Sequence, residues 1–512
     1  MGSNIVYTVK NVEFTVDGFK LPVTSVRIDL ALNQIPYYMI DVPPCGWNDN
    51  LIKIGSPGLA DGKQLLKQCF EWANKRAICK LKIELQPTSD GNAGSPVKLE
   101  LNDWVLGNAS LGTVNVTNGY LLNLQVFHPA FNLTKFGLFC DGLAAPIDLT
   151  TVSGSDIVSI ADSTYKKIVE SLKSVRQKTP DKNIDSLPRY SGTKELNDLA
   201  EKITELATQN ASPSKYLSWS GGGLPLYTVQ STLDNARSKG EESVRIAMAS
   251  ECIPRQGASV WDSVLAAAEN WGCVIVPTYT SSTLSVTPSN PWAKPSASVS
   301  DTQISQLQFP SFDSDPVLGV RCVNSQAATL AGVDTNYEDK INESMVSTWC
   351  YIPQGVVTGD SSNMLAHGRL YNIGTPQWWG SLAAAAQSLR TFNMDGKSHD
   401  DDTVSASEPT ESIESALYAA QVIYAAYVFQ LLFKQTFTAS FSGPVLLSLI
   451  PGSVISVKDK SGSVFNGYMI GVSHTFSVSS SSAMTSVTLS YCREEGGYKG
   501  VCEEGDSNPL YK

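Results

Sequence analysis

The sequence has little charge for its length. Asp, Glu, Lys and Arg together make up 17% of its 512 residues, and the formal net charge is −11. Because a freely exposed surface is usually rich in charged residues, we interpret this scarcity as a sign that neighbouring molecules cover much of the surface. The acidic balance also argues against stable nucleic-acid binding, which depends on neutralising phosphates with Lys and Arg.

Catalytic signatures are also lacking. The chain has four histidines, which are far apart, and it has no G-x-S-x-G, H-E-x-x-H, Walker or Rossmann motif. His474 alternates with apolar residues, so we predict a satisfied histidine inside a sheet rather than a base. We therefore predict no catalytic, cofactor-binding or metal-binding residue and no enzymatic activity, although the 49 acidic residues leave a glycosidase-like carboxylate pair open.

The cysteines form no metal-binding pattern. The ten cysteines are scattered, with no C-x-x-C pair, which argues against a zinc or iron–sulfur site. Reduced, buried thiols are the favoured interpretation, because cytosolic synthesis is expected. The alternative is that two candidate disulfides, Cys69–Cys79 and Cys492–Cys502, form in an oxidising medium; spacing alone does not decide between these states.

Targeting and membrane signals are weak. The first residues contain no basic region followed by an apolar run, so no secretory signal is predicted and synthesis in the cytosol is expected. Residues Ala416–Phe433 come nearest to a membrane span, but tyrosines interrupt the segment and no basic cluster marks one side. A buried helix that braces the last barrel is favoured, and no stable membrane association is expected.

What the sequence does contain is β-strand patterning, most clearly in Phe437–Cys492. Apolar and small polar residues alternate there, which predicts three antiparallel strands at Leu449–Lys458, Val464–Val478 and Met484–Tyr491. Gly467 and Gly471 lie inside the second strand and predict a bulge or a sharp coil of the sheet. The three strands are expected to close into a small barrel.

The rest of the chain divides into segments of different composition. We predict an N-terminal tube-like β-barrel at 1–146 with one helix near Asp61–Ala77, a helical linker at 147–220, and a small α/β domain at 221–310. The first strands of a second β-barrel follow at 311–375, a helical interruption and the bracing helix at 376–435, the barrel's completion at 436–495, and a peripheral tail at 496–512. The predicted fold class is therefore mainly β with α+β insertions, built from two tube-like antiparallel β-barrels, a small α/β domain and helical segments.

Two features of these segments have alternative functional interpretations. Acidic residues and His399 in the 393–403 loop could bind a cation, but their spacing fits no calcium loop and a solvated loop is favoured. Trp261, Trp271 and Trp292 could form a carbohydrate platform, but core or interface positions are favoured.

Three stretches resemble the hub proteins of contractile phage tails. The C-terminal strands contain Pro451-Gly452 followed by a Y-x-x-G-V-x-H strand in which Tyr468, Gly471, Val472 and His474 stand at matching positions. The opening stretches Val16–Ile28 and Asn33–Ile40 are similar to the start of the same family. The helix and hairpin of the predicted α/β domain are similar to that family's inserted domain. The late-control hubs of this family are related to the hub part of type VI secretion spikes.

The resemblance implies a structural virion protein: the central baseplate hub of a contractile tail or a related injection particle. It implies a homotrimer whose two barrels per chain form a pseudo-six-fold ring. That ring would join the tail tube or a tube initiator above to a spike below, with baseplate wedge proteins around it and viral DNA in transient passage through the lumen. A cell-wall hydrolase with β accessory modules and a sugar-binding tail adhesin remain the alternatives.

Overall fold

The computed structural model describes a mainly β chain, which confirms the predicted fold class. The described residues are 5–45, 62–89, 92–115, 119–134, 156–159, 161–163, 165–166, 212–221, 259–270, 273–279, 281–291, 293–311, 317–323, 346–349, 369–374 and 438–494. Within these ranges, no helix combines the length and the apolar character needed to cross a membrane.

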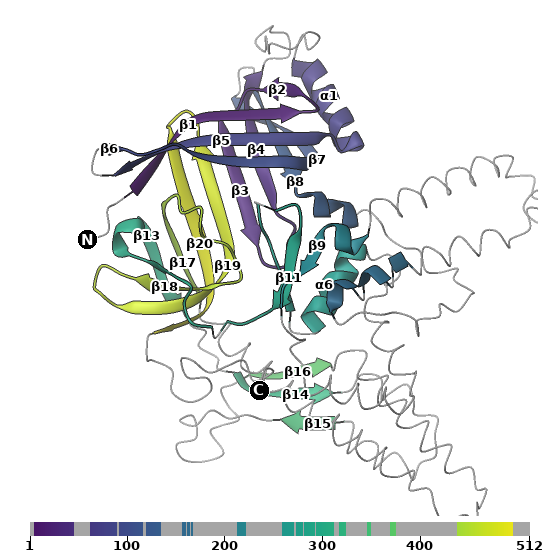
Figure 1. Cartoon of the computed structure of the whole chain (residues 1–512), viewed down its shortest axis with the longest axis vertical. Coiled ribbons are helices and arrows are strands. Elements are labelled where there is room, and N and C mark those ends of the chain that lie inside the picture. The colour runs from purple at the N-terminus through teal and green to yellow at the C-terminus, as the bar shows by residue number, and fades with distance from the viewer. Residues whose placement is uncertain are drawn as a thin grey trace, which may run out of the picture.

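The described elements follow one another in chain order from β1 to β20 (Figure 1). The N-terminal elements are β1 (Ile5–Val16), β2 (Phe19–Leu21), β3 (Ser25–Ala31), β4 (Tyr37–Cys45), α1 (Gly62–Lys75), β5 (Ile78–Ser89), β6 (Asn92–Ala93), β7 (Val97–Asn115), β8 (Gly119–Phe127) and η1 (Pro129–Thr134). The middle holds η4 (Pro213–Lys215), β9 (Leu217–Trp219), α6 (Val260–Asn270), β10 (Cys273–Val276), β11 (Leu284–Pro288), β12 (Ala297–Val299), η5 (Asp301–Gln303), β13 (Gln306–Ser311), β14 (Val317–Val323), β15 (Val346–Trp349) and β16 (Arg369–Gly374). The last strands are β17 (Thr438–Pro444), β18 (Val454–Lys458), β19 (Val464–Ser477) and β20 (Ser482–Glu494).

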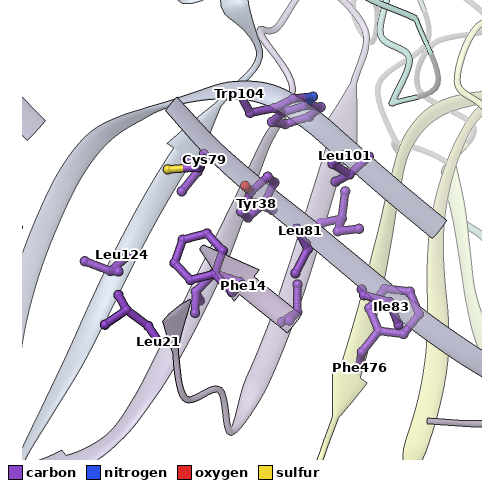
Figure 2. Packing of buried hydrophobic residues seen from close by; sticks show 14 of the residues in the cluster. Phe14, Leu21, Tyr38, Cys79, Leu81, Ile83, Leu101, Trp104, Leu124 and Phe476 are labelled. Carbon is purple, nitrogen blue, oxygen red and sulfur yellow. The ribbon is translucent and has the colours of Figure 1, made fainter. Parts of the chain in front are cut away.

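Eight strands close into a ring in the order β19-β3-β4-β8-β7-β5-β1-β20, and β20 pairs back with β19. The alternation of β3 shows why the ring has a core: Val26, Ile28 and Leu30 are buried, whereas Arg27 on the opposite face is exposed. Figure 2 shows part of this interior, in which Phe476 of β19 belongs to the same apolar cluster as Phe14 and Tyr38 of the N-terminal strands. The last strands of the chain therefore complete the first barrel.

Helix α1 packs against β7 of this ring. Its Trp72 and Cys69 are buried in the ring's core, and the Trp72 ring lies 5.4 Å from that of Phe19, between centroids. Phe70, on the same helix, is 50% exposed. The helix that was predicted near 61–77 thus covers the barrel with only one of its faces.

A second, curled sheet has the order β12-β18-β19-β20-β17-β13 and encloses its own apolar cluster, which includes Phe441, Ile455 and Phe465. β19 and β20 are long enough to belong to both units, so one hairpin is the shared wall (yellow in Figure 1). The register between β19 and β20 shifts at Asn466/Tyr468, where β20 holds the extra residue, and at Met469/Gly471, where β19 holds it. The irregularity predicted at Gly471 is thereby confirmed as a β19 bulge, whereas β19 pairs with β18 in regular register through Gly467 and has no bulge there.

Two strand assignments made from the sequence are wrong. The strand predicted from Leu449 begins only at Val454, because Pro451 has no N–H to donate and Gly452 takes a φ of +92°. The segments expected to open the second barrel instead form a separate sheet, β15-β14-β16, in which β14 pairs on both sides. The barrel instead takes β12 and β13, and the predicted domain limits themselves remain predictions.

The small α/β unit consists of α6 and the sheet β10-β11-β9. Ser259 caps α6: its hydroxyl accepts the Asp262 N–H (3.1 Å), and the Asp262 carboxylate accepts the Ser259 N–H (3.1 Å). The predicted helix and hairpin are confirmed here.

Several predicted features lie outside the described residues. They are residues 167–211 of the predicted helical linker, the 393–403 acidic loop, the bracing helix Ala416–Phe433 and the tail after residue 495. The residues 157–159, 161–163 and 165–166 of the predicted helical linker are helical.

Candidate assembly surface and domain joint

One outward face runs without interruption across both sheet units. It is carried by seven neighbouring strands in the order β13-β17-β20-β19-β3-β4-β8. Hydroxyl and amide side chains dominate it, and we call it the hydroxyl face. Its partly or fully exposed polar members include Gln306, Gln308, Ser440, Ser442, Ser486, Thr488, Ser473, Thr475, Ser25, Asn123 and Gln125.

Strand register aligns these side chains in rows across the face. One row passes from Gln306 to Ser442, to Ser486, to Ser473 and then to Asp29. Thr favours strands, but Ser, Gln and Asn are not among the residues that are enriched in them. Their accumulation on one side of several strands therefore indicates a requirement of the surface rather than of the sheet.

The few charges on the hydroxyl face are neutralised or held in place. The Arg27 Nε donates to Asp29 Oδ1 (3.0 Å) and to the Ser473 hydroxyl (3.2 Å). The Asp41 carboxylate accepts hydrogen bonds from Asn123 Nδ2 (2.7 Å) and from the Ser25 hydroxyl. No lysine lies among the described outward-facing residues of these seven strands.

The opposite wall of the first barrel has different chemistry. β1, β5 and β7 carry cross-strand ion pairs on their outer side: Lys10–Glu84 at 3.4 Å and Lys82–Glu100 at 3.2 Å between nitrogen and oxygen. Side chains in these pairs are between 23% and 55% exposed, so each contributes little to stability. We call this wall the charged face.

The second sheet ends in two open edges. In the described part of the chain, β12 pairs only with β18, and β13 pairs only with β17. Gln306 and Gln308 on β13 are exposed. Strand edges of this kind present unpaired N–H and C=O groups to another strand.

A hydrogen-bonded joint fixes the α/β unit to the sheets. Asn33, in the β3–β4 turn with a φ of +61°, donates its N–H to the Ile275 carbonyl (2.9 Å) and accepts the Ile275 N–H on its side-chain oxygen (2.8 Å). Its amide also donates to Glu269 Oε1 on α6 (3.3 Å). Asn33 thus pairs with β10 as a one-residue strand would.

The connection between β10 and β11 enters the barrel core at Tyr279. Its hydroxyl donates to the Leu447 carbonyl, and its ring meets the His474 ring edge to face at 6.0 Å between centroids. His474 Nδ1 lies 2.8 Å from the Thr485 hydroxyl, which accepts the Leu446 N–H (2.8 Å). Burial lowers the pKa of His474 to about 4, against a smaller raising effect of Asp29.

His128 holds the same connection two residues later. Its Nδ1 accepts the Ala130 N–H (3.1 Å), so the neutral ring has its proton on Nε2, which donates to the Ser281 carbonyl (3.1 Å). The ring also meets Trp104 edge to face. Burial lowers the pKa of His128 to about 4.

The structure brings one of the two candidate cysteine pairs together. Cys69 of α1 and Cys79 of β5 are buried thiols in the same cluster. The pKa of Cys79 is raised, mainly by burial and secondly by the neighbouring Cys69. Cys492 is also a buried thiol, whereas Cys502 lies outside the described residues. Disulfide formation at either pair remains a prediction.

The sequence did not identify Asn33 or Tyr279 as important residues, and the structure locates only one of the three tryptophans considered as a sugar platform. Trp261 is buried, while Trp271 and Trp292 lie outside the described residues. Asn33 and Tyr279 carry no motif; the only local signal is an Asn after a strand, which also indicates an ordinary turn. In the described part of the chain, no group of three or more His, Cys, Asp or Glu side chains could hold a metal ion.

Comparison with known proteins gives distant structural similarity only. No protein-family model matches the chain, and no curated protein matches it in sequence. Its structural neighbours are phage and prophage tail proteins and proteins related to type VI secretion spikes.

Three of these neighbours span nearly the whole chain. A tail protein of Neisseria meningitidis is 12% identical over 95% of this chain and 96% of its own, with a TM-score of 0.43. A 43 kDa tail protein of a Shewanella oneidensis prophage is 8% identical over 93% and 96%, with a TM-score of 0.39. A type VI secretion component of E. coli, described as structurally similar to T4 phage tail proteins, is 8% identical over 94% and 76%, with a TM-score of 0.33.

Proposed function

We propose that the chain is a structural, non-enzymatic protein of a virion tail, the central baseplate hub of a contractile tail or a related injection particle. Three copies would form a ring with pseudo-six-fold symmetry, because each copy contributes two curved β units. The observation that carries this proposal is the shared hairpin β19–β20, which fuses both units into one continuous wall.

The chemistry of the two faces supports an orientation within that ring. A polyanion is retained by surface Lys and Arg, because neutralised phosphates release their counterions. The hydroxyl face has no described lysine, and its Arg27 is paired with Asp29, so it suits the wall of a channel through which DNA passes. The charged face would then lie outside, toward baseplate wedge proteins.

The open edges of the second sheet support assembly. Backbone groups at the edges of β12 and β13 would pair with, or be covered by, the neighbouring copy, which removes an aggregation hazard of the monomer. The two ends of the ring would meet the tail tube or tube initiator on one side and the spike on the other. The protein would be made in the host cytoplasm and act in the tail baseplate.

Native mass spectrometry of the purified full-length chain tests this proposal. One chain has a mass of 55.1 kDa, so the ring predicts a species of about 165 kDa that persists on dilution. A stable monomer that degrades peptidoglycan would favour the hydrolase, and a monomer that binds cell-surface sugars would favour the adhesin. Either monomeric outcome contradicts the hub.

A further inference from the structure

We propose that the connection between β10 and β11 is an acid-sensitive latch, with His128 and His474 as its two triggers. The latch comprises the described residues Pro277–Tyr279 and Ser281–Thr283. When closed, it holds the α/β unit against both sheet units; when the two imidazoles gain protons, it opens. This proposal is independent of the proposed function.

The two histidines contact the latch from different parts of the fold. His474, on β19, lies against the Tyr279 ring, and His128, at the end of β8, binds the Ser281 carbonyl. Both side chains are fully buried, at 0% exposure, although they lie at the boundary of two structural units. Opening the latch would withdraw Tyr279 and admit water to both rings.

Protonation leaves each closed site with a donor that has no acceptor. At His128, a proton on Nδ1 would face the Ala130 N–H, so two donors would oppose each other at 3.1 Å. At His474, a doubly protonated ring could donate from Nδ1 to the Thr485 hydroxyl, but its Nε2–H would have no acceptor among the described residues. Each charge would also be buried, which costs free energy unless a counter-charge is present.

Counter-charge near the latch is weak. Asp29 on β3 is the one charged group that acts on the pKa of His474; its Oδ1 pairs with Arg27, and its Oδ2 has no hydrogen-bond partner among the described residues. Tyr279 faces His474 from the latch, and burial raises its pKa to about 12, so it stays neutral. At His128, the hydrogen bond to the Ser281 carbonyl opposes the lowering of the pKa by burial, and no charged group contributes.

The surroundings of the two histidines determine how closure of the latch depends on pH. Each closed-state pKa is about 4, below the ordinary histidine value of 6.5, so the open state takes up protons first as the pH falls. Closure is therefore strongest above pH 6.5 and weakens continuously down to about pH 4. At pH 5 the opening equilibrium should rise on the order of 30-fold per histidine, if opening fully hydrates the ring.

Hydrogen exchange of the full-length chain, measured by mass spectrometry from pH 7.5 to 4.5 and corrected for intrinsic exchange rates, tests the latch. We expect peptides that cover β10, the latch and β11 to lose protection below about pH 6. Peptides from β4 and β8, inside the ring, should stay protected. Uniform loss across all peptides, or none in the latch, would overturn the proposal.

Two variants separate protonation from packing. The double variant H128Q/H474N keeps a donor toward Ser281 and an acceptor toward Thr485 but cannot titrate, so its latch should exchange equally at pH 7.5 and 5. Y279F removes the bond to Leu447 and keeps both histidines, so exchange should rise at every pH with an unchanged pH slope. If H128Q/H474N retains the wild-type slope, or Y279F abolishes it, the histidines are not the triggers.

Discussion

Single residues decide how the α/β unit is fixed to the sheets. Gly452, at φ +92°, brings the turn before β18 against Val276 of β10: a Cβ on Gly452 would lie 2.9 Å from the Val276 Cγ2. Gly462 has nearly the same conformation, at φ +90°, but nothing lies within 4 Å of its Cβ position. The two glycines therefore differ in packing and share the same backbone requirement.

This difference gives a matched pair of substitutions. We expect Gly462→Ala to lower the free energy of unfolding by about 1 kcal/mol, because alanine disfavours positive φ. Gly452→Ala should lower it by about 2–3 kcal/mol, since Val276 must also move. Urea denaturation followed by tryptophan fluorescence measures both. Equal losses would mean that the Val276 contact adds nothing.

For single residues, prediction from sequence is correct where apolar and polar residues alternate along one strand. The alternation around His474 predicted a buried histidine, and the structure confirms this position. It predicted full satisfaction as well, but within the described residues Nε2 has no hydrogen-bond partner. The reason is that its environment is made by Tyr279, almost two hundred positions away, which no local pattern can place.

At the scale of elements, α1 shows how one helix is divided between core and surface. Trp72 is 1% exposed and packs in the ring's cluster, whereas Phe70 is 50% exposed. Trp72→Ala should lower the free energy of unfolding by about 3–5 kcal/mol, because a large cavity would open under the helix. Phe70→Ala, on the same helix, should change it by less than about 0.5 kcal/mol. Thermal and urea unfolding measure the pair, and similar losses would contradict the described packing.

The edges of the second sheet give a test of assembly. Lysines on an edge strand discourage pairing with another strand, so Q306K/Q308K on β13 should weaken the proposed trimer by about tenfold or more. Asn102→Lys, an exposed position on β7 inside the closed ring, is the control and should leave assembly unchanged. Mass photometry over a dilution series measures the dissociation. Equal behaviour of the two variants would remove β13 from the interface.

Element prediction from sequence was correct where periodicity and glycine gave independent signals. The β19 bulge was predicted from Gly471, and a helix was predicted where the structure has α6. The start of β18 was misplaced because Pro451 and Gly452 continue an apolar run that resembles a strand. The partners of β14 were wrong because alternation shows that a strand exists but does not show which strand it joins.

At the scale of the whole molecule, the two β units cannot behave independently. β20 pairs with β1 at Thr8–Ser482 and then with β17 from Pro444–Met484 onward, so one strand leaves the first barrel and enters the second sheet. A force on one unit is therefore carried through continuous backbone pairing to the other. Such a coupling would suit the proposed ring, which would have to keep its shape between two neighbours.

The sequence predicted two β units but not their fusion. Closing the ring requires strands from opposite ends of the chain to pair, as β3 does with β19. The hydroxyl face has the same origin, because its rows exist only once strands from three distant segments are in register. The amino-acid composition shows that charged residues are few, but only the assembled sheet shows which surface lacks them.

The most direct test of the central claim is electron microscopy of the purified oligomer at a resolution that traces strands. We predict a three-fold ring with a central channel, lined by the hydroxyl face of β13, β17, β20, β19, β3, β4 and β8, with the charged face of β1, β5 and β7 outside. A particle without a channel, or a ring whose channel is lined by the charged face, would contradict the account.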